Sequence, residues 1–243
     1  MRYLIIRPGA IGDAIVTLPV VQQLKESLPE AFVELVVSGA AAELLRGRCR
    51  ADVVSDYHDS RWTTLFAETP SPALRAHLEG FATAILYLME PRDKLARRLQ
   101  KGLGIRPIIW PPLPDPKAPL PISLHLQGAL TPLGIAPRPL VPTLYLTCKD
   151  RAFAQNFWTE HHLPTACDAP VVAVHPGSGS NKKNWPANRF AALCRKLAQD
   201  DSVRILIIAG PADEALVQRL LSEWQGALPV VAQSLTLAQV GAL

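Results

Sequence analysis

The pattern of apolar and polar positions alternates between two kinds of segment along the chain. Short apolar runs, typical of buried strands, are followed by stretches whose apolar residues recur every three to four positions, typical of amphipathic helices. In the first half, the apolar runs predict strands at 2–6, 32–37, 52–55, 82–88 and 106–109. The periodic stretches predict helices at 13–27, 40–47, 71–79 and 91–102. Such alternation indicates a doubly wound α/β domain with a parallel sheet.

A second alternating series begins after a segment that is rich in proline. Residues 106–142 contain RPIIWPPLPDPKAPLP and a helical island around LHLQGALTPLGI. Because proline fixes φ and cannot donate to a strand ladder, this density predicts loops and a domain boundary. A helical stretch, KDRAFAQNFWTEHHL, then leads into the second series: strand 171–176, helix 187–199, strand 203–210, helix 212–224 and strand LPVVA. We expect two α/β domains, 1–145 and 169–243, joined by a linker and helix at 146–168.

Composition restricts the class of protein. The chain has 243 residues, 49% of them hydrophobic, which suffices for two modest cores. It has no run of about 18 uncharged apolar residues and no secretory leader pattern, so we expect a cytoplasmic protein. The net charge of +4 suits anionic ligands but is too small to indicate nucleic acid. The four cysteines lack CxxC spacing and the histidines have no identifiable partners, so we expect neither a disulfide framework nor a metal site.

The first candidate site is RPGAIGDAIVTLP, residues 7–19, directly after the first predicted strand. Its glycines allow close backbone approach, and Gly12 and Asp13 open the next helix at the carboxyl edge of the sheet, where open α/β folds bind ligands. An ordinary helix cap is the alternative for Asp13, and this stretch alone favours it. Pro19 falls in the second turn of the predicted helix, so we expect a kink there.

The second candidate site is HPGSGSNKKNWP, residues 175–186, between a strand and a helix. Backbone amides at a helix N-terminus, with small residues and two lysines beside them, can form a cradle for an anion. Ser178 and Ser180 could donate hydrogen bonds to phosphate oxygens, and Lys182 or Lys183 could neutralise a diphosphate. A solvated surface loop is the alternative. The site is not a P-loop, because the pattern GxxxxGK[ST] is missing.

The third feature, IIAGPADEALVQRLL, repeats the succession of strand, turn and helix. Asp213 and Glu214 fall in the first helical turn, where acidic side chains can accept hydrogen bonds from a ribose. Any helix start also prefers acidic residues, because they complement the helix dipole. By itself, this feature favours the helix-start interpretation.

Taken in order, these segments resemble the glycosyltransferase family 9 heptosyltransferases of lipopolysaccharide inner-core synthesis. The similarity is carried by PGAIGD and TLP near the N-terminus, by HPGSGSNKKNWPANRF and by AGPADE, and it follows the whole chain. It implies a GT-B fold of two Rossmann-like domains, the N-terminal one for the acceptor and the C-terminal one for an ADP-sugar. It also implies inverting transfer of a heptose or related sugar, with no metal and no other cofactor.

The resemblance assigns roles to individual residues. Asp13 matches the general base that takes a proton from the acceptor hydroxyl while that oxygen attacks the anomeric carbon. Lys183 matches the lysine that contacts the diphosphate. The other implied substrate contacts are small, hydroxyl-bearing or acidic residues, the acidic ones near the ribose: Gly12, Ser178, Ser180, Asp213 and Glu214.

The implied partners are ADP-heptose or a related nucleotide sugar and a phosphorylated, lipid-linked core oligosaccharide. Such an acceptor would bring the chain to the cytoplasmic face of the inner membrane. Contact there would be peripheral, through basic residues such as Arg92, Arg97 and Arg98 near anionic lipid. We expect no nucleic-acid partner.

The sequence departs from the family pattern at its C-terminus. Family members continue after a stretch like SLTLAQVGAL and supply an Asp-Ser/Thr-Gly-x-x-His motif, which is missing here. We therefore expect a truncated second domain. A non-catalytic, truncated nucleotide-sugar-binding remnant is the alternative function. An unrelated Rossmann-type oxidoreductase is disfavoured, because the first turn lacks GxGxxG.

Overall fold

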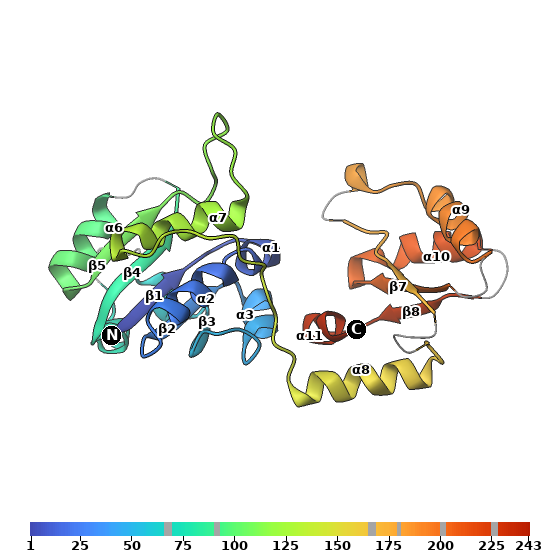
Figure 1. The fold of residues 1–243 in the computed structure, drawn as a ribbon, viewed down its shortest axis with the longest axis horizontal. Helices are drawn as coiled ribbons and strands as arrows, with labels where there is room; N and C mark the ends of the chain where they lie inside the picture. The colour runs from blue at the N-terminus through green and yellow to red at the C-terminus, as the bar shows by residue number, and fades with distance from the viewer. Residues whose placement is uncertain (66–69, 90–92, 165–168, 179–180, 200–202, 225–227) are drawn as a thin grey trace. The chain divides into compact units, whose positions relative to one another are not determined.

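The chain folds into two compact units, Met1–Tyr145 and Leu146–Leu243. Figure 1 shows that both are built from parallel strands and helices in the computed structural model. The structure describes most of the sequence: residues 1–65, 70–89, 93–164, 169–178, 181–199, 203–224 and 228–243. Each unit is described by itself below.

A five-stranded parallel sheet forms the centre of the first unit, with the strand order β3-β2-β1-β4-β5. Its strands are β1 (Arg2–Ile6), β2 (Phe32–Val37), β3 (Val53–Asp56), β4 (Phe81–Tyr87) and β5 (Arg106–Trp110). All five strands predicted in this half are confirmed to within one residue at each end. The order reverses beside β1, which pairs with both β2 and β4. Such a reversal is a topological switch point, where open α/β sheets bind ligands.

Helical segments cover both faces of this sheet (Figure 1). They are α1 (Ile11–Ile15), α2 (Leu18–Ser27), α3 (Gly39–Leu45), α4 (Ser60–Thr63), α5 (Pro72–Leu78), α6 (Asp93–Arg97), the π-helical turn η1 (Arg98–Gly102), α7 (Ile122–Gln127) and the 3-10 segment η2 (Gly128–Leu133). Tyr3 and Ile5 of β1 pack with α2, α3 and α7. Leu4 and Ile6 pack with α4, α5 and α6. Because successive side chains of a strand point to opposite faces, a continuous apolar run is buried on both, which is the doubly wound arrangement.

Two prolines lie within a helix or a strand, at positions where their missing backbone N–H is tolerated. The predicted helix 13–27 is divided: α1 ends at Ile15, α2 begins at Leu18, and Pro19 lies in the first turn of α2. The N–H groups of the first helical turn have no partner within the helix, so proline is tolerated there. The kink expected at Pro19 is therefore wrong: the chain instead has a break between two helices. Pro107 lies in β5, which is an edge strand of the sheet, where the loss of one ladder donor is also tolerated.

The second unit contains a parallel sheet with the order β6-β7-β8 among its described residues. Its strands are β6 (Val171–Val174), β7 (Arg204–Ala209) and β8 (Val230–Gln233). Its helical segments are α8 (Cys148–Glu160), η3 (Asn181–Lys183), α9 (Ala187–Leu197), η4 (Pro211–Asp213), α10 (Glu214–Ser222) and α11 (Leu237–Ala242). The three predicted strands are confirmed with ends that differ by one or two residues. The α/β class with doubly wound parallel sheets is therefore confirmed.

Helices also lie on both faces of the second sheet. Cys194 of α9 and Leu220 of α10 belong to the core on one face. Phe157 of α8 packs with Leu206 and Ala232 on the other. The segment 146–168, expected as a link between domains, thus contributes α8 to the core of this unit. Neither α11 nor the short α4 was among the predicted helices, because each is too brief to show a period.

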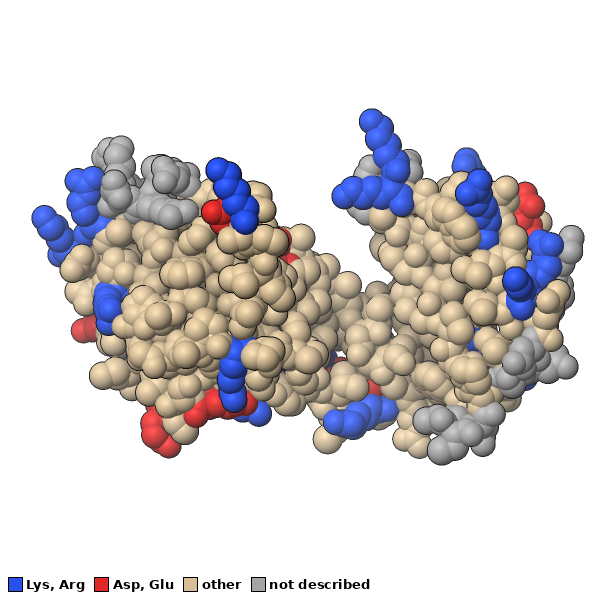
Figure 2. All heavy atoms as spheres, turned by 45° about the horizontal axis from the view of Figure 1, so that its top comes forward, with Lys and Arg blue, Asp and Glu red and all other residues tan. Residues whose placement is uncertain are grey.

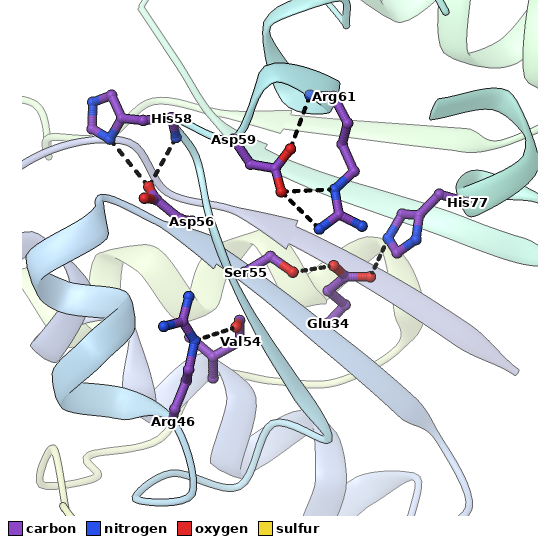
Figure 3. A network of polar contacts seen from close by, with 9 residues as sticks. All are labelled: Glu34, Arg46, Val54, Ser55, Asp56, His58, Asp59, Arg61 and His77. Carbon is purple, nitrogen blue, oxygen red and sulfur yellow. Dashed lines mark hydrogen bonds and ion pairs between the residues drawn. The ribbon is translucent and has the colours of Figure 1, made fainter. Parts of the chain in front are cut away.

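A polar network lies within the first unit on the face covered by α4 and α5 (Figure 3). Glu34, in the middle of β2, is only 1% exposed. It accepts a hydrogen bond from Ser55 Oγ of β3 at 2.5 Å, and its other carboxylate oxygen lies 2.8 Å from His77 Nε2 of α5. The His77 ring packs edge-on against buried Trp62. The network gives a buried carboxylate the partners that it needs.

Candidate functional site

Asp13 lies at the carboxyl edge of the first sheet, beside the switch point. β1 ends at Ile6, the chain turns through residues 7–10, and Asp13 is the third residue of α1. Strand order reverses next to β1, so this edge is where a ligand crevice is expected in an open α/β sheet. The structure thus places Asp13 where the sequence predicted it.

The Asp13 carboxylate is fixed by two donors. Oδ1 forms an ion pair of 2.8 Å with Nη2 of Arg7, and Oδ2 accepts a hydrogen bond of 2.9 Å from the Ala10 backbone N–H. The Asp13 side chain is nevertheless 38% exposed. Asp13 therefore satisfies a backbone donor at the start of α1, as the helix-cap interpretation held, and still presents part of its carboxylate to solvent. The two interpretations are compatible.

Gly9 makes room for this carboxylate. Its φ is +142°, and a Cβ added there would lie 2.5 Å from Asp13 Oδ2. A Cβ added at Gly12 would meet nothing within 4 Å. The close approach expected of this glycine-containing turn is therefore found at Gly9, and a contact of Gly12 with substrate stays a prediction.

Arg7 is the buried partner of Asp13, and sequence analysis missed it. Its side chain is 4% exposed, Nη2 also lies 3.4 Å from the Pro112 carbonyl oxygen, and the guanidinium lies 5.8 Å from the ring centre of Tyr87. Burial lowers the pKa of Arg7, while the negative charge of Asp13 opposes this effect. The available signal was a single arginine at the end of an apolar run.

The segments around Arg7 are themselves anchored. Tyr87, the last residue of β4, is fully buried and donates a hydrogen bond of 2.7 Å to the Leu126 carbonyl. Trp110, the last residue of β5, donates to the His125 carbonyl at 3.0 Å. His125 Nε2 in turn lies 2.8 Å from the Pro111 carbonyl oxygen. These bonds fix the start of the proline-rich loop 111–121, which projects from the unit in Figure 1.

The second unit has a cavity of about 840 Å³ at the carboxyl ends of β6 and β7. It lies between the starts of α9 and α10, and its lining includes Ser178, Asn184, Trp185, Asp213 and Arg219. Pockets that bind small molecules typically have volumes of about 300 to 1,000 Å³. Two residues predicted as substrate contacts, Ser178 and Asp213, are thus brought together at one cavity. The exposed cation Arg219 was not predicted, because a lone arginine on a helix carries no sequence signal.

Asp213 joins the loops that follow β6 and β7. Its carboxylate is nearly buried, accepts a hydrogen bond of 2.8 Å from the Gly210 N–H and lies 3.9 Å from His175 Nδ1. A Cβ at Gly177 would lie 1.8 Å from Asp213 Oδ1. The hydrogen bond to Gly210 agrees with the helix-start interpretation of Asp213. A role toward a ribose stays a prediction.

The remaining predicted residues differ in how far the structure describes them. Ser178 Oγ lies 2.6 Å from Asn184 Oδ1 in the same loop. Lys183 is exposed at the end of η3 and forms no ion pair within the described part of the chain. Glu214 is exposed in the first turn of α10 and is not part of the cavity lining. Ser180 lies outside the described residues.

Figure 2 shows how the basic side chains are distributed over one face of the molecule. On the face drawn in Figure 2, Lys and Arg side chains lie in small separate groups.

Across the described ranges, no cluster of three or more His, Cys, Asp or Glu side chains could hold a metal ion. In the same ranges, no helix has the length and apolar character needed to cross a bilayer.

Comparison with known proteins identifies the family. A family model described as glycosyltransferase family 9 (heptosyltransferase) matches residues 122–243, just over half of the chain. No curated protein matches the chain.

Three similar solved structures show the same fold. A family 9 glycosyl transferase from Veillonella parvula is 17% identical with a TM-score of 0.77, and the match covers 99% of this chain and 72% of that protein. ADP-heptose lipopolysaccharide heptosyltransferase II from E. coli is 17% identical with a TM-score of 0.71, covering 100% and 76%. E. coli heptosyltransferase WaaC with ADP is 22% identical with a TM-score of 0.62, covering 100% and 78%.

At these identities the likeness establishes the fold, which is of the GT-B type with two Rossmann-like units. The chain spans about three-quarters of the length of these neighbours. Since the family model covers half of the sequence, the assignment does not depend on fold alone. The chain belongs to glycosyltransferase family 9, the heptosyltransferase family.

Proposed function

We propose that the chain is an inverting glycosyltransferase that moves a heptose or related sugar from an ADP-sugar to a lipopolysaccharide inner-core acceptor. The observation that carries the proposal is Asp13. In a chain of this family, it presents a partly exposed carboxylate, held by two hydrogen-bond donors, at the switch point of the first sheet. One solved neighbour, a heptosyltransferase, contains ADP.

Asp13 acts as the general base on the acceptor side. Its carboxylate takes the proton of the acceptor hydroxyl while that oxygen forms a bond to the anomeric carbon of the donor sugar. The bond between the anomeric carbon and the diphosphate oxygen breaks, its electron pair leaves with ADP, and the anomeric centre inverts. Each carboxylate oxygen can accept two hydrogen bonds, so one position on each remains after Arg7 and Ala10 have bonded.

The cavity of the second unit takes the nucleotide diphosphate. Negative charge grows on the diphosphate as the sugar departs, so a cation beside it stabilises the transition state more than the ground state. Lys183 supplies that cation, and Ser178 and Ser180 donate to phosphate oxygens. Asp213 or Glu214 accepts hydrogen bonds from the ribose. In this mechanism the side chains neutralise the charge, and no metal or other cofactor is required.

The acceptor is a phosphorylated, lipid-linked core oligosaccharide, reached at the cytoplasmic face of the inner membrane. Of the three basic residues considered for contact with anionic lipid, Arg97 is exposed on α6. Arg92 and the side chain of Arg98 lie outside the described residues. Contact of this kind is electrostatic, so it weakens as ionic strength rises.

The test compares Asp13→Asn with the wild-type chain for sugar transfer and for ADP affinity. Loss of a general base lowers turnover by at least about 100-fold, and ADP affinity stays within about twofold because Asp13 lies in the other unit. Glu30→Gln, at an exposed carboxylate of the first unit, is the matched control. Full turnover in Asp13→Asn would disprove the assigned role.

The alternative function has a distinct outcome in the same experiment. A non-catalytic nucleotide-sugar-binding protein binds ADP, loses that affinity in Lys183→Ala and transfers no sugar with any inner-core acceptor. Transfer by the wild-type chain excludes it.

A further inference from the structure

Arg7 is an unusual residue for a purely structural position. It directly follows β1 and is 4% exposed, although burying a guanidinium is costly unless it is paired. The effect of burial is visible in the lowered pKa of Arg7. Its Nε atom is buried without a hydrogen-bond partner in the described structure. An apolar side chain would fill the same space without this cost.

Closing the turn between β1 and α1 does not require the Arg7 guanidinium. The Arg7 backbone N–H extends the sheet by bonding to the Val36 carbonyl at 2.9 Å, which any residue other than proline could do. The start of α1 is closed by the bond from the Ala10 N–H to Asp13 Oδ2. What the guanidinium adds is one bond to the other carboxylate oxygen, Oδ1, at 2.8 Å.

Two donors on different oxygens restrict the Asp13 side chain to one orientation. With Ala10 alone, the carboxylate could rotate about its bonds and exchange oxygens. With Arg7 as well, rotation would break a charge-assisted bond, which is stronger than a bond between neutral groups. The exposed part of the carboxylate then stays in a fixed place at the sheet edge.

Arg7 is held by the scaffold rather than by Asp13 alone. Its guanidinium lies over the Tyr87 ring, and Tyr87 is anchored to the Leu126 carbonyl. The Pro112 carbonyl oxygen lies 3.4 Å from the same Nη2 that bonds Asp13. Residues at the ends of β1, β4 and β5 therefore meet at the Arg7 guanidinium. The sheet thus sets the position of the guanidinium, and the guanidinium sets the position of the Asp13 carboxylate.

Resting on the proposed role of Asp13 as general base, we propose that Arg7 is its positioning residue. The guanidinium fixes the rotamer of the carboxylate and does not itself touch substrate. It acts on turnover only through Asp13.

The test uses Arg7→Met, which removes the charge at similar length, and Arg7→Lys, which keeps it. A displaced catalytic group costs about 10- to 100-fold in kcat, so Arg7→Met loses that much while KM for the donor and ADP affinity stay within about twofold. Arg7→Lys recovers at least part of the kcat. Arg106→Met, which removes an exposed arginine bonded to the Pro132 carbonyl at the other end of β5, leaves kcat unchanged.

A double-mutant cycle separates this proposal from the proposed function. If Arg7 acts only through Asp13, adding Arg7→Met to Asp13→Asn causes no further loss of kcat. An additional loss of kcat in the double variant overturns the positioning role, and so does full kcat in Arg7→Met alone. In either case, Asp13→Asn still tests whether Asp13 is the general base. Full turnover in Asp13→Asn instead contradicts the proposed function itself.

A second readout needs no turnover. Three-bond NMR couplings of Asp13 report whether its χ1 angle occupies one rotamer or an average of several. We expect one rotamer in the wild type and in Arg106→Met, and averaging in Arg7→Met, with the melting temperature and amide spectrum confirming that each variant is folded. A single unchanged rotamer in folded Arg7→Met overturns the proposal.

Discussion

The same contact between a glycine and a carboxylate occurs in both units. Asp13 and Asp213 each accept a hydrogen bond from a backbone N–H three residues earlier, Ala10 or Gly210. Each carboxylate also lies where a glycine has no Cβ, at Gly9 or Gly177. A carboxylate can approach a backbone this closely only where the side chain is a hydrogen, so each aspartate depends on its glycine.

Gly9→Ala tests this dependence in the first unit. The added methyl group would overlap Asp13 Oδ2, and the φ of +142° is unfavourable for any residue with a Cβ. Asp13 must rotate away, so we expect kcat to fall by at least about tenfold with ADP affinity unchanged. Steady-state kinetics and calorimetric ADP titration measure the two quantities.

Gly80→Ala is the control for backbone strain. Its φ is +82°, but an added Cβ would have only the Arg2 side chain nearby, at 3.8 Å. It should lower the melting temperature without changing kcat. Equal losses of kcat in the two variants would mean that strain, and not the Asp13 contact, explains the effect.

At the scale of elements, polar side chains connect strands and helices that the apolar pattern alone cannot order. Glu34 joins β2 to β3 through Ser55 and to α5 through His77 (Figure 3). Asp52, just before β3, accepts bonds from the Val33 N–H and from Lys25 of α2. Both carboxylates therefore tie the β2–β3 pair to a helix, one on each face of the sheet.

Glu34→Ala should destabilise the first unit. The Ser55 hydroxyl and the His77 ring each lose a partner, and an unsatisfied buried group costs about 1–3 kcal/mol in the free energy of unfolding. Urea denaturation measures this change, with Glu30→Ala, at an exposed glutamate, as the matched control. A loss no greater than that of the control would show that the network contributes little.

The pair between Lys25 and Asp52 predicts a pH dependence of stability. Burial raises the pKa of Asp52, but the hydrogen bonds from Lys25 and the Val33 N–H outweigh it, so the folded pKa lies below the usual 3.8. The folded state thus favours the charged form of Asp52, and the charged carboxylate stabilises the fold. Its stabilisation is fully present well above pH 3.8 and is lost as pH falls through the folded pKa.

Asp52→Asn should therefore lower the melting temperature at pH 7, and the difference from the wild type should shrink below pH 3.8. Scanning calorimetry across this range measures it. Glu43→Gln, at an exposed carboxylate of α3, controls for the general effect of charge. A difference that stays constant with pH would exclude ionisation of Asp52 as its source.

At the scale of the whole molecule, each unit has its own sheet with apolar clusters on both faces. The Asp13 site belongs to the first unit and the large cavity to the second. The proposed function therefore assigns acceptor chemistry and nucleotide binding to separately packed parts. A ligand that binds one unit should stabilise that unit by mass action.

Hydrogen exchange with and without ADP tests this separation. We expect ADP to slow exchange in the loops after β6 and β7, at residues 175–178 and 210–213, because they border the cavity. Exchange around α1 in the first unit should not change. Slower exchange in the first unit alone would place the nucleotide site in that unit and contradict the proposed assignment.

The sequence by itself determined the strands, the longer helices and the family. Apolar runs and helical periods predicted the strands of both sheets, because burial on both faces leaves a continuous apolar run in the sequence. Local chemistry also placed Asp13 at a helix start and Ser178 in a loop after a strand. The spacing of these motifs along the chain carried the resemblance to family 9, which the family model then confirmed.

The tertiary structure alone decided which side chains meet. Arg7 and Tyr87 are 80 positions apart in the sequence, and they meet only because β1 and β4 are neighbours at the switch point. Glu34 finds His77 through the packing of α5 on the sheet. The need for glycine at position 9 depends on where the Asp13 carboxylate lies. Periodicity reports burial along a segment, whereas these contacts depend on strand order and on the path of each loop, which no local pattern encodes.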